Sequence, residues 1–115
     1  MYKILICDTF EQTRNTMTSA LVDRCELACI SSEDEFQREI RAKQFDLVFL
    51  DPPYNKNLII PALDHLRLSQ SLENGARIIV EHSQLEPVEP DRPAFEMVDQ
   101  RRYGKTLVSF LNYVI

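Results

Sequence analysis

Several residue types and patterns are scarce in this sequence, and each scarcity narrows the possible classes of protein. Its 115 residues include two glycines, two histidines and no tryptophan. No apolar run approaches the roughly 20 residues that a membrane-spanning helix needs. Residues 1–10 also lack the basic flank and small-residue cleavage site of a signal peptide. We therefore expect a cytoplasmic protein that does not interact with membranes.

Cysteines and basic residues are also few. The cysteines Cys7, Cys25 and Cys29 are odd in number and lack the spacing of metal ligands, so we interpret them as reduced thiols and expect no metal site. With 13 Lys and Arg against 18 Asp and Glu, the formal net charge is −5. Proteins that bind nucleic acid unaided are usually basic, because phosphate contacts supply most of their affinity. Any nucleic-acid role must therefore depend on a local basic patch.

What the sequence does contain is an alternation of apolar strand-like segments with amphipathic helical ones. Strands are expected at residues 2–7, 26–30, 45–50 and 76–82. Two capping boxes predict helix starts, one formed by Thr9 with Gln12 and one by Ser32 with Glu35. Asn57 predicts the start of a third helix, and Gly75 predicts its end. Residues 83–93 read as a loop, and residues 95–115 as a hairpin that turns at Gly104-Lys105.

This order predicts one domain, residues 1–115, of the α/β class. Near-continuous apolar strands separated by helices indicate a mainly parallel sheet covered on both faces, a three-layer Rossmann-like sandwich. Ligands of such sheets bind beyond the carboxyl ends of the strands. We therefore expect Asp8, Asp51, Glu81 and the turn at Gly104 to share one edge of the sheet.

The third strand ends in an unusual stretch, "FDLVFLDPPYNKN" (residues 45–57). Pro52 and Pro53 have no N–H and cannot continue a ladder, so their carbonyls and the Asp51 carboxylate are left as fixed acceptors. Tyr54 adds a flat ring for stacking. This set suits a planar heterocycle with an exocyclic amino group. The alternative is a rigid turn that ends the strand, with Tyr54 covering the core.

Beyond that local chemistry, the sequence resembles a known family. "LDPPY" resembles the [DN]PP[YFW] motif of S-adenosylmethionine-dependent methyltransferases that modify exocyclic amines of bases. "IIVEHS" (residues 78–83) and "FEMVDQRRYGKTLVSFL" (residues 95–111) resemble the fifth strand and closing hairpin of the RsmD-type ribosomal RNA guanine-N2 methyltransferases. The resemblance is strong over residues 45–111. It implies a methyltransferase that uses S-adenosylmethionine and acts on ribosomal RNA.

The resemblance also assigns roles to particular residues. It implies that Asp51 and Pro52 orient the target amine, that Pro53 shapes the loop and that Tyr54 stacks on the base. By position, Asp8 corresponds to the acid that binds the cofactor ribose, and the acid beside the adenine falls around Ser32 or Glu33.

The family's first strand and glycine-rich cofactor loop have no counterpart in these residues. Without that strand, the expected order becomes 2-1-3-4-6-5 with an antiparallel last strand. We then expect weak binding of S-adenosylmethionine. A catalytically silent or partner-dependent remnant of the family, or a homo-oligomer, is an alternative.

A different class of function also fits some residues. Asp8 and Asp51 occupy positions that resemble the acids of response-regulator receiver domains.

The basic residues Arg101, Arg102 and Lys105 suit RNA phosphates, although a solvated hairpin tip would carry the same charges. His82, at the same edge, is either a general base or a structural histidine.

Overall fold

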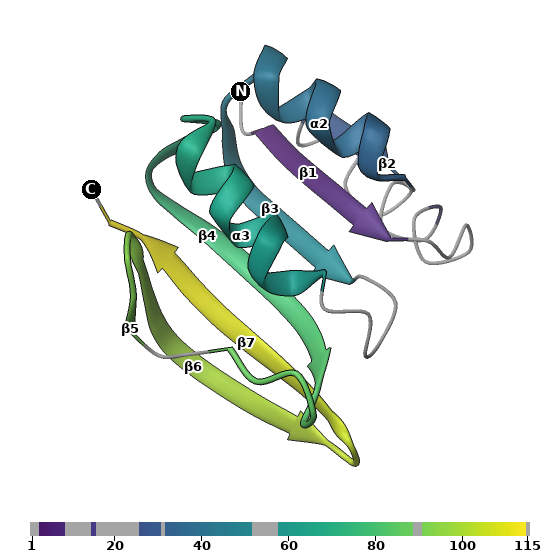
Figure 1. Ribbon diagram of the computed structural model, residues 1–115, viewed down its shortest axis with the longest axis vertical. Helices are drawn as coiled ribbons and strands as arrows, with labels where there is room; N and C mark the ends of the chain where they lie inside the picture. Colours follow the sequence, from purple (N-terminus) through teal and green to yellow (C-terminus); the bar gives the residue numbers. More distant parts are fainter. Residues whose placement is uncertain are drawn as a thin grey trace.

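The computed structural model contains one mixed sheet with helices α2 and α3 packed against it (Figure 1). It describes residues 3–8, 15, 26–30, 32–51, 58–88 and 91–114. The elements are β1 (Lys3–Asp8), β2 (Glu26–Ile30), α2 (Glu33–Ala42), β3 (Phe45–Asp51), α3 (Ile59–Leu68), β4 (Leu72–Ser83), β5 (Asp91–Arg92), β6 (Phe95–Tyr103) and β7 (Thr106–Tyr113). Within these described ranges, no helix is both long and apolar enough to cross a membrane.

The sheet has seven strands in the order β2-β1-β3-β4-β7-β6-β5. Strands β1 to β4 are parallel to one another, and β7 runs antiparallel between β4 and β6. The predicted six-strand order, 2-1-3-4-6-5, is not matched, because the segment expected to be a loop contributes the short edge strand β5. Ala94 adopts a φ of 71°, and this tight reversal pairs Asp91 and Arg92 with Glu96 and Phe95.

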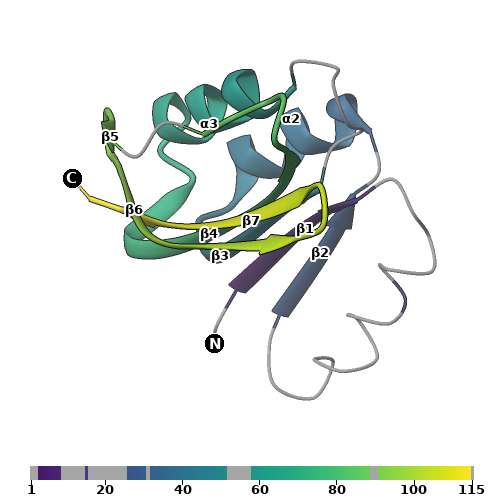
Figure 2. The same ribbon diagram turned by 90° about the horizontal axis from the view of Figure 1, so that it is seen from below.

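Both described helices lie on the same face of the sheet, as Figure 2 shows. The crossovers from β2 to β3 and from β3 to β4 move in the same direction across the sheet, so right-handed connections place α2 and α3 on one side. The described residues therefore form two layers and do not match the predicted three-layer sandwich. The helix expected to start at Thr9 falls outside the described residues.

The hydrophobic core lies between these helices and the sheet. Val48 on β3 and Val80 on β4 point toward the helices and are fully buried. They meet Leu63 and Leu66 of α3, which are fully buried as well. Alternate residues of each strand point to the other face, because side chains in a strand have a period of two.

The helix ends agree with the sequence in one case and not in another. The Oγ of Ser32 accepts a hydrogen bond from the backbone N–H of Glu35 at 3.2 Å, which confirms this N-cap of α2. By contrast, α3 has Leu58 as its N-cap, without a side-chain capping bond. Asn57, where the cap was predicted, lies outside the described residues.

The prediction that Gly75 ends α3 is wrong. The helix ends at Leu68, and Gly75, with a φ of 82°, lies inside β4. Phe45 pairs with Leu72 but Leu47 pairs with Arg77, so the intervening residues of β4 form a bulge. Glycine with a positive φ occurs both in some bulges and at many helix ends, which is why one glycine signal fitted both.

The closing hairpin has the predicted turn. Tyr103 of β6 pairs with Thr106 of β7, which leaves Gly104 and Lys105 as the turn, and Gly104 has a φ of 63°. A bulge at Val98 interrupts β6, since Met97 pairs with Leu111 and Asp99 with Phe110. This extra residue decides which face each later side chain of β6 occupies.

Candidate functional site

A row of side chains crosses the sheet at the carboxyl ends of the parallel strands. Asp8 pairs in register with Asp51, and Glu81 is the residue after Val80, which pairs with Leu50. Glu81 pairs with Val108, which in turn pairs with Arg101. We call these residues the rim row: Asp8, Asp51, Glu81, Val108 and Arg101. By strand alternation, the rim row lies on the face opposite α2 and α3.

The predicted shared edge is therefore confirmed. Ser83 at the end of β4 pairs with Thr106, so the Gly104 turn lies just beyond the carboxyl end of β4. Parallel strands bring Asp8, Asp51 and Glu81 to this edge, and the antiparallel β7 brings the turn there.

Asp51 lies between two other carboxyl groups and is half-buried. Burial, followed by the charges of Glu81 and Asp8, raises the pKa of Asp51 from 3.8 to about 7. Hydrogen bonds from Asp51 to Asp8 and Glu81 act in the same direction. Asp8 is only 2% exposed. A ligand that brings N–H donors to this group would relieve the repulsion among the carboxylates.

The remaining residues of the DPPY stretch, Pro52, Pro53 and Tyr54, lie outside the described residues. Ser32 is described, and its side chain caps α2. Its Oγ accepts from the N–H of Glu35 and also donates to the Glu35 carboxylate, both at 3.2 Å. The cofactor role of Ser32 stays a prediction.

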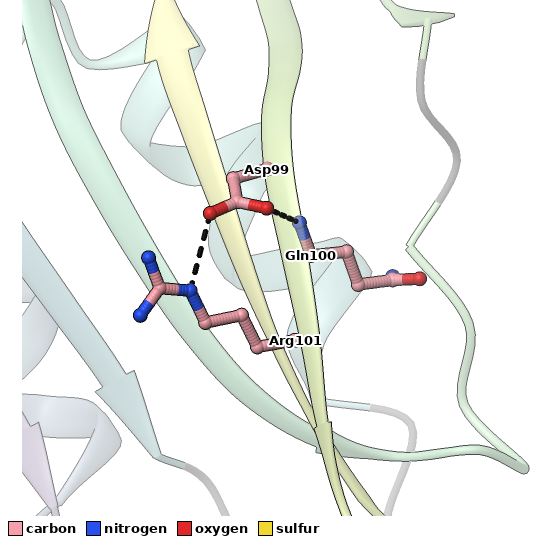
Figure 3. Close-up of polar contacts among 3 residues, drawn as sticks. All are labelled: Asp99, Gln100 and Arg101. Carbon is pink, nitrogen blue, oxygen red and sulfur yellow. Dashed lines mark hydrogen bonds and ion pairs between the residues drawn. The ribbon is translucent and has the colours of Figure 1, made fainter.

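The three basic residues at this edge do not share one face. Arg101 is on the face opposite the helices, where its Nε donates to Asp99 Oδ2 at 3.2 Å (Figure 3). Arg102, the next residue along the strand, points to the other face and donates from Nε to the Gly104 carbonyl at 2.9 Å. Lys105 is exposed in the turn. The structure thus separates Arg101 from Arg102.

Arg101 is held in a defined position. Its guanidinium carbon lies 5.6 Å from the centroid of the Phe110 ring, so the side chain leans from β6 across β7. Hydrogen bonds to Asp99 and then to Tyr103 raise the pKa of Arg101 above its ordinary value. The other oxygen of Asp99 accepts from the N–H of Gln100 at 2.8 Å (Figure 3), which orients the carboxylate.

His82 is completely buried and has a structural set of contacts. Its Nδ1 lies 2.8 Å from the Glu86 carbonyl, and its Nε2 lies 2.7 Å from the Oγ of Ser109. Because the Glu86 carbonyl can only accept, Nδ1 carries a ring proton and donates to it. In that tautomer Nε2 accepts from the Ser109 hydroxyl, whose oxygen accepts from Gln100 Nε2 at 2.9 Å. These contacts favour the structural interpretation of His82 over the general-base one.

Two partners in this region were not singled out in the sequence. Glu81 was placed at the edge but not recognised as a neighbour of the Asp51 carboxyl group, although it raises the Asp51 pKa. Phe110, under Arg101, was missed as well. Alternation along β4 and β7 points to both residues, but assigning Arg101 to their face requires knowledge of the bulge at Val98.

The fit of these residues to S-adenosylmethionine is partial. Asp8, at the end of β1, offers a carboxylate for ribose hydroxyls. The two glycines of the sequence, Gly75 and Gly104, lie in the β4 bulge and the hairpin turn. A close approach of the backbone to the cofactor would need a glycine in the loop after β1. Neither glycine lies there.

One protein family matches almost the whole chain. The family described as conserved hypothetical protein 95 matches residues 8–112. The chain belongs to this family. The match confirms the RsmD-type resemblance carried by the DPPY stretch and the hairpin.

Individual relatives support the same assignment. An uncharacterized methylase of Rickettsia prowazekii (strain Madrid E) is 35% identical over 71 residues, which are 62% of this chain and 30% of that protein. The matched segment thus covers less than a third of the length of that relative.

Among solved structures, a phosphoethanolamine N-methyltransferase 2 from Haemonchus contortus, bound to S-adenosylhomocysteine, has a TM-score of 0.72. It is 10% identical, over 98% of this chain and 33% of that one. An rRNA methylase from Streptococcus thermophilus has a TM-score of 0.59 and 12% identity, over 99% of this chain and 87% of that one. At these identities the likeness shows a methyltransferase-like α/β fold.

Proposed function

We propose that this chain is a methyltransferase domain whose rim holds an exocyclic amine of an RNA base, with guanine N2 as the target and S-adenosylmethionine as the methyl donor. The observation that carries the proposal is the position of Asp51 at the end of β3, between Asp8 and Glu81. Family membership, the methylase relative and the rRNA methylase with a similar fold support it.

In this function, the residues after β3 bind and orient the base. The Asp51 carboxylate and the Pro52 carbonyl accept the two N–H bonds of the amine, Tyr54 stacks on the ring, and Pro53 holds the shape of the loop. S-adenosylmethionine, when bound, supplies the methyl group. Rate acceleration comes mainly from orientation, because attack by a positioned amine needs little acid–base assistance. Ionised Asp51 is a stronger acceptor for its N–H bond than protonated Asp51, so amine binding should strengthen as the pH rises through about 7.

The test is transfer of a labelled methyl group from S-adenosylmethionine to deproteinised small-subunit ribosomal RNA, at high concentrations of both. We expect slow incorporation that is lost in Asp51→Asn and retained in Asp64→Asn, a matched change on α3. Incorporation that persists in Asp51→Asn would contradict the role of Asp51. Absence of any incorporation would favour a catalytically silent or partner-dependent member of the family.

A thermal-shift measurement tests the cofactor separately. A ligand with a dissociation constant of 10 μM, supplied at 1 mM, stabilises a fold by about 2.7 kcal/mol. In a domain of this size that corresponds to a rise in Tm well above about 5 °C. Since a single hydrogen bond to a charged group contributes only roughly 1.5–3 kcal/mol, we expect almost no rise. A rise of this size would show that other residues complete the cofactor site.

The receiver-like alternative has a distinct signature, phosphorylation of Asp51 by acetyl phosphate in the presence of magnesium. The family match and the closing hairpin favour the methyltransferase instead. Intact mass spectrometry decides between the two, because a phosphate adduct on Asp51 would support the receiver-like function.

A further inference from the structure

The open face of the β6–β7 hairpin continues the rim row beyond the proposed amine site. From Asp51, one strand spacing leads to Glu81, a second to Val108 and a third to Arg101. With strands about 4.8 Å apart, the Cα of Arg101 lies about 14 Å from that of Asp51. Both side chains are on the face opposite the helices, so one extended ligand can contact both.

Tyr103 extends this face toward the hairpin tip. It follows Arg101 by two residues and therefore points to the same side, about 7 Å further along β6. Tyr103 is 61% exposed, which is unusual for a large aromatic residue that packs against a core. Its ring is thus available to stack against a ligand, and its hydroxyl contacts Arg101.

The position of Arg101 is restrained before any ligand binds. Asp99 binds its Nε at 3.2 Å (Figure 3). The Phe110 ring lies beneath its guanidinium. The side chain is still 62% exposed. Such a restraint lowers the entropy that would be lost when the guanidinium binds an anion.

The charges along this surface match those of a nucleotide chain. The carboxyl group of Asp51 suits the amino hydrogens of a base, whereas Arg101 suits a phosphate, and Tyr103 suits the face of the next base. The net charge of −5 makes the rest of the molecule unfavourable for RNA. On this face Arg101 lies near the carboxyl groups of Glu81 and Asp99, so the phosphate contact depends on Arg101 itself.

We propose that Arg101 and Tyr103 form a binding platform for single-stranded RNA next to the target nucleotide, with Phe110 supporting Arg101. Arg101 contacts a phosphate, and Tyr103 stacks on a neighbouring base. The proposal rests on the proposed function, because Asp51 sets where the target base lies. It adds that the RNA crosses the open face of the hairpin rather than the face of Arg102.

The test is binding of a fluorescein-labelled single-stranded RNA of about eight nucleotides to the 115-residue chain, followed by fluorescence anisotropy without any methyl donor. We expect Tyr103→Ala to weaken binding on the order of tenfold, as for the loss of one base–aromatic stack. Tyr103→Phe should retain most of the affinity. The exposure of Tyr103 makes these changes compatible with folding, and circular dichroism checks this.

The role of Arg101 is tested by comparing Arg101→Ala with two other variants that each remove one arginine charge. Arg101→Ala should reduce the slope of log K against log salt by about 0.7, the value for one phosphate contact on a single strand. Arg102 lies on the opposite face. The fold-loss of affinity in Arg102→Ala should therefore be at least three times smaller than the fold-loss in Arg101→Ala. Arg77→Ala, on the same face but remote from the rim, should leave binding unchanged.

Three results would overturn the platform: equal losses in Arg101→Ala and Arg102→Ala, no loss in Tyr103→Ala, or no detectable binding by the unmodified chain. The first would show that only the total charge of the hairpin matters. Because no methyl transfer is measured, failure of the enzymatic assay and failure of the platform are independent results.

Discussion

Substitution of Asp51 by Asn should make the protein more stable, and more so at high pH. The folded state holds the pKa of Asp51 at about 7, against 3.8 as its ordinary value. Between these values the folded protein binds more protons than the unfolded chain. The free energy of unfolding therefore falls as pH rises from about 4 to about 7, and the contribution of this group is constant above that. Asn removes the titration and keeps the shape.

The size of the effect follows from the same two pKa values. Their difference corresponds to at most about 4 kcal/mol of destabilisation at pH 8. Asp51 is only half-buried, so solvent screening reduces this to about 2 kcal/mol. We expect Asp51→Asn to exceed the wild type by about that amount at pH 8, and by well under 1 kcal/mol at pH 4.

Urea denaturation at pH 4, 6 and 8, followed by circular dichroism, measures this difference. Glu73→Gln is the matched control for the loss of one carboxylate, since Glu73 is exposed on β4 outside the rim row. A stability difference for Asp51→Asn that is the same at all three pH values, or that grows toward low pH, would refute the account of the carboxyl cluster.

Three further changes test the local structure, each by urea denaturation at pH 7. Ser109→Ala removes the hydroxyl that donates to buried His82 and should cost about 1–3 kcal/mol; no loss would contradict the assigned hydrogen bond. Gly75→Ala places a side chain at a φ of 82° in open space and should cost about 1 kcal/mol. Gly75→Asn should cost less, and equal losses would argue against backbone strain. Ser32→Ala removes the N-cap of α2 and should cost about 1 kcal/mol, whereas Ser32→Asp should restore most of it.

The strands and the hairpin could be predicted because their signals are local. The segment at residues 45–50 is a run of mainly apolar residues, and the observed strand covers it and adds Asp51. Gly104 in a two-residue turn sets the hairpin, because few other residues adopt its φ of 63°. Since parallel strands place their carboxyl ends together, the alternation of strands and helices also predicted the edge shared by Asp8 and Asp51.

Gly75 shows where a local signal is ambiguous. Its positive φ serves a bulge in β4 rather than a helix end, and only pairing with β3 distinguishes the two. The short strand β5 likewise forms because the reversal at Ala94 pairs it with β6. Neither the β4 bulge nor the strand β5 has a periodic pattern of apolar residues that would predict it from the sequence.

The sequence by itself determined the chemistry available at the rim: an acid at the end of β1, an acid before two prolines, and basic residues in and beside the closing turn. Tertiary structure decided how these groups act. Register places Glu81 beside Asp51 and raises its pKa to about 7, and one bulge at Val98 puts Arg101 on the same face as Asp51 and Arg102 on the other. A one-residue shift in a strand moves every later side chain to the opposite face. Local residue preferences contain no record of that shift, which arises only when the strands pair.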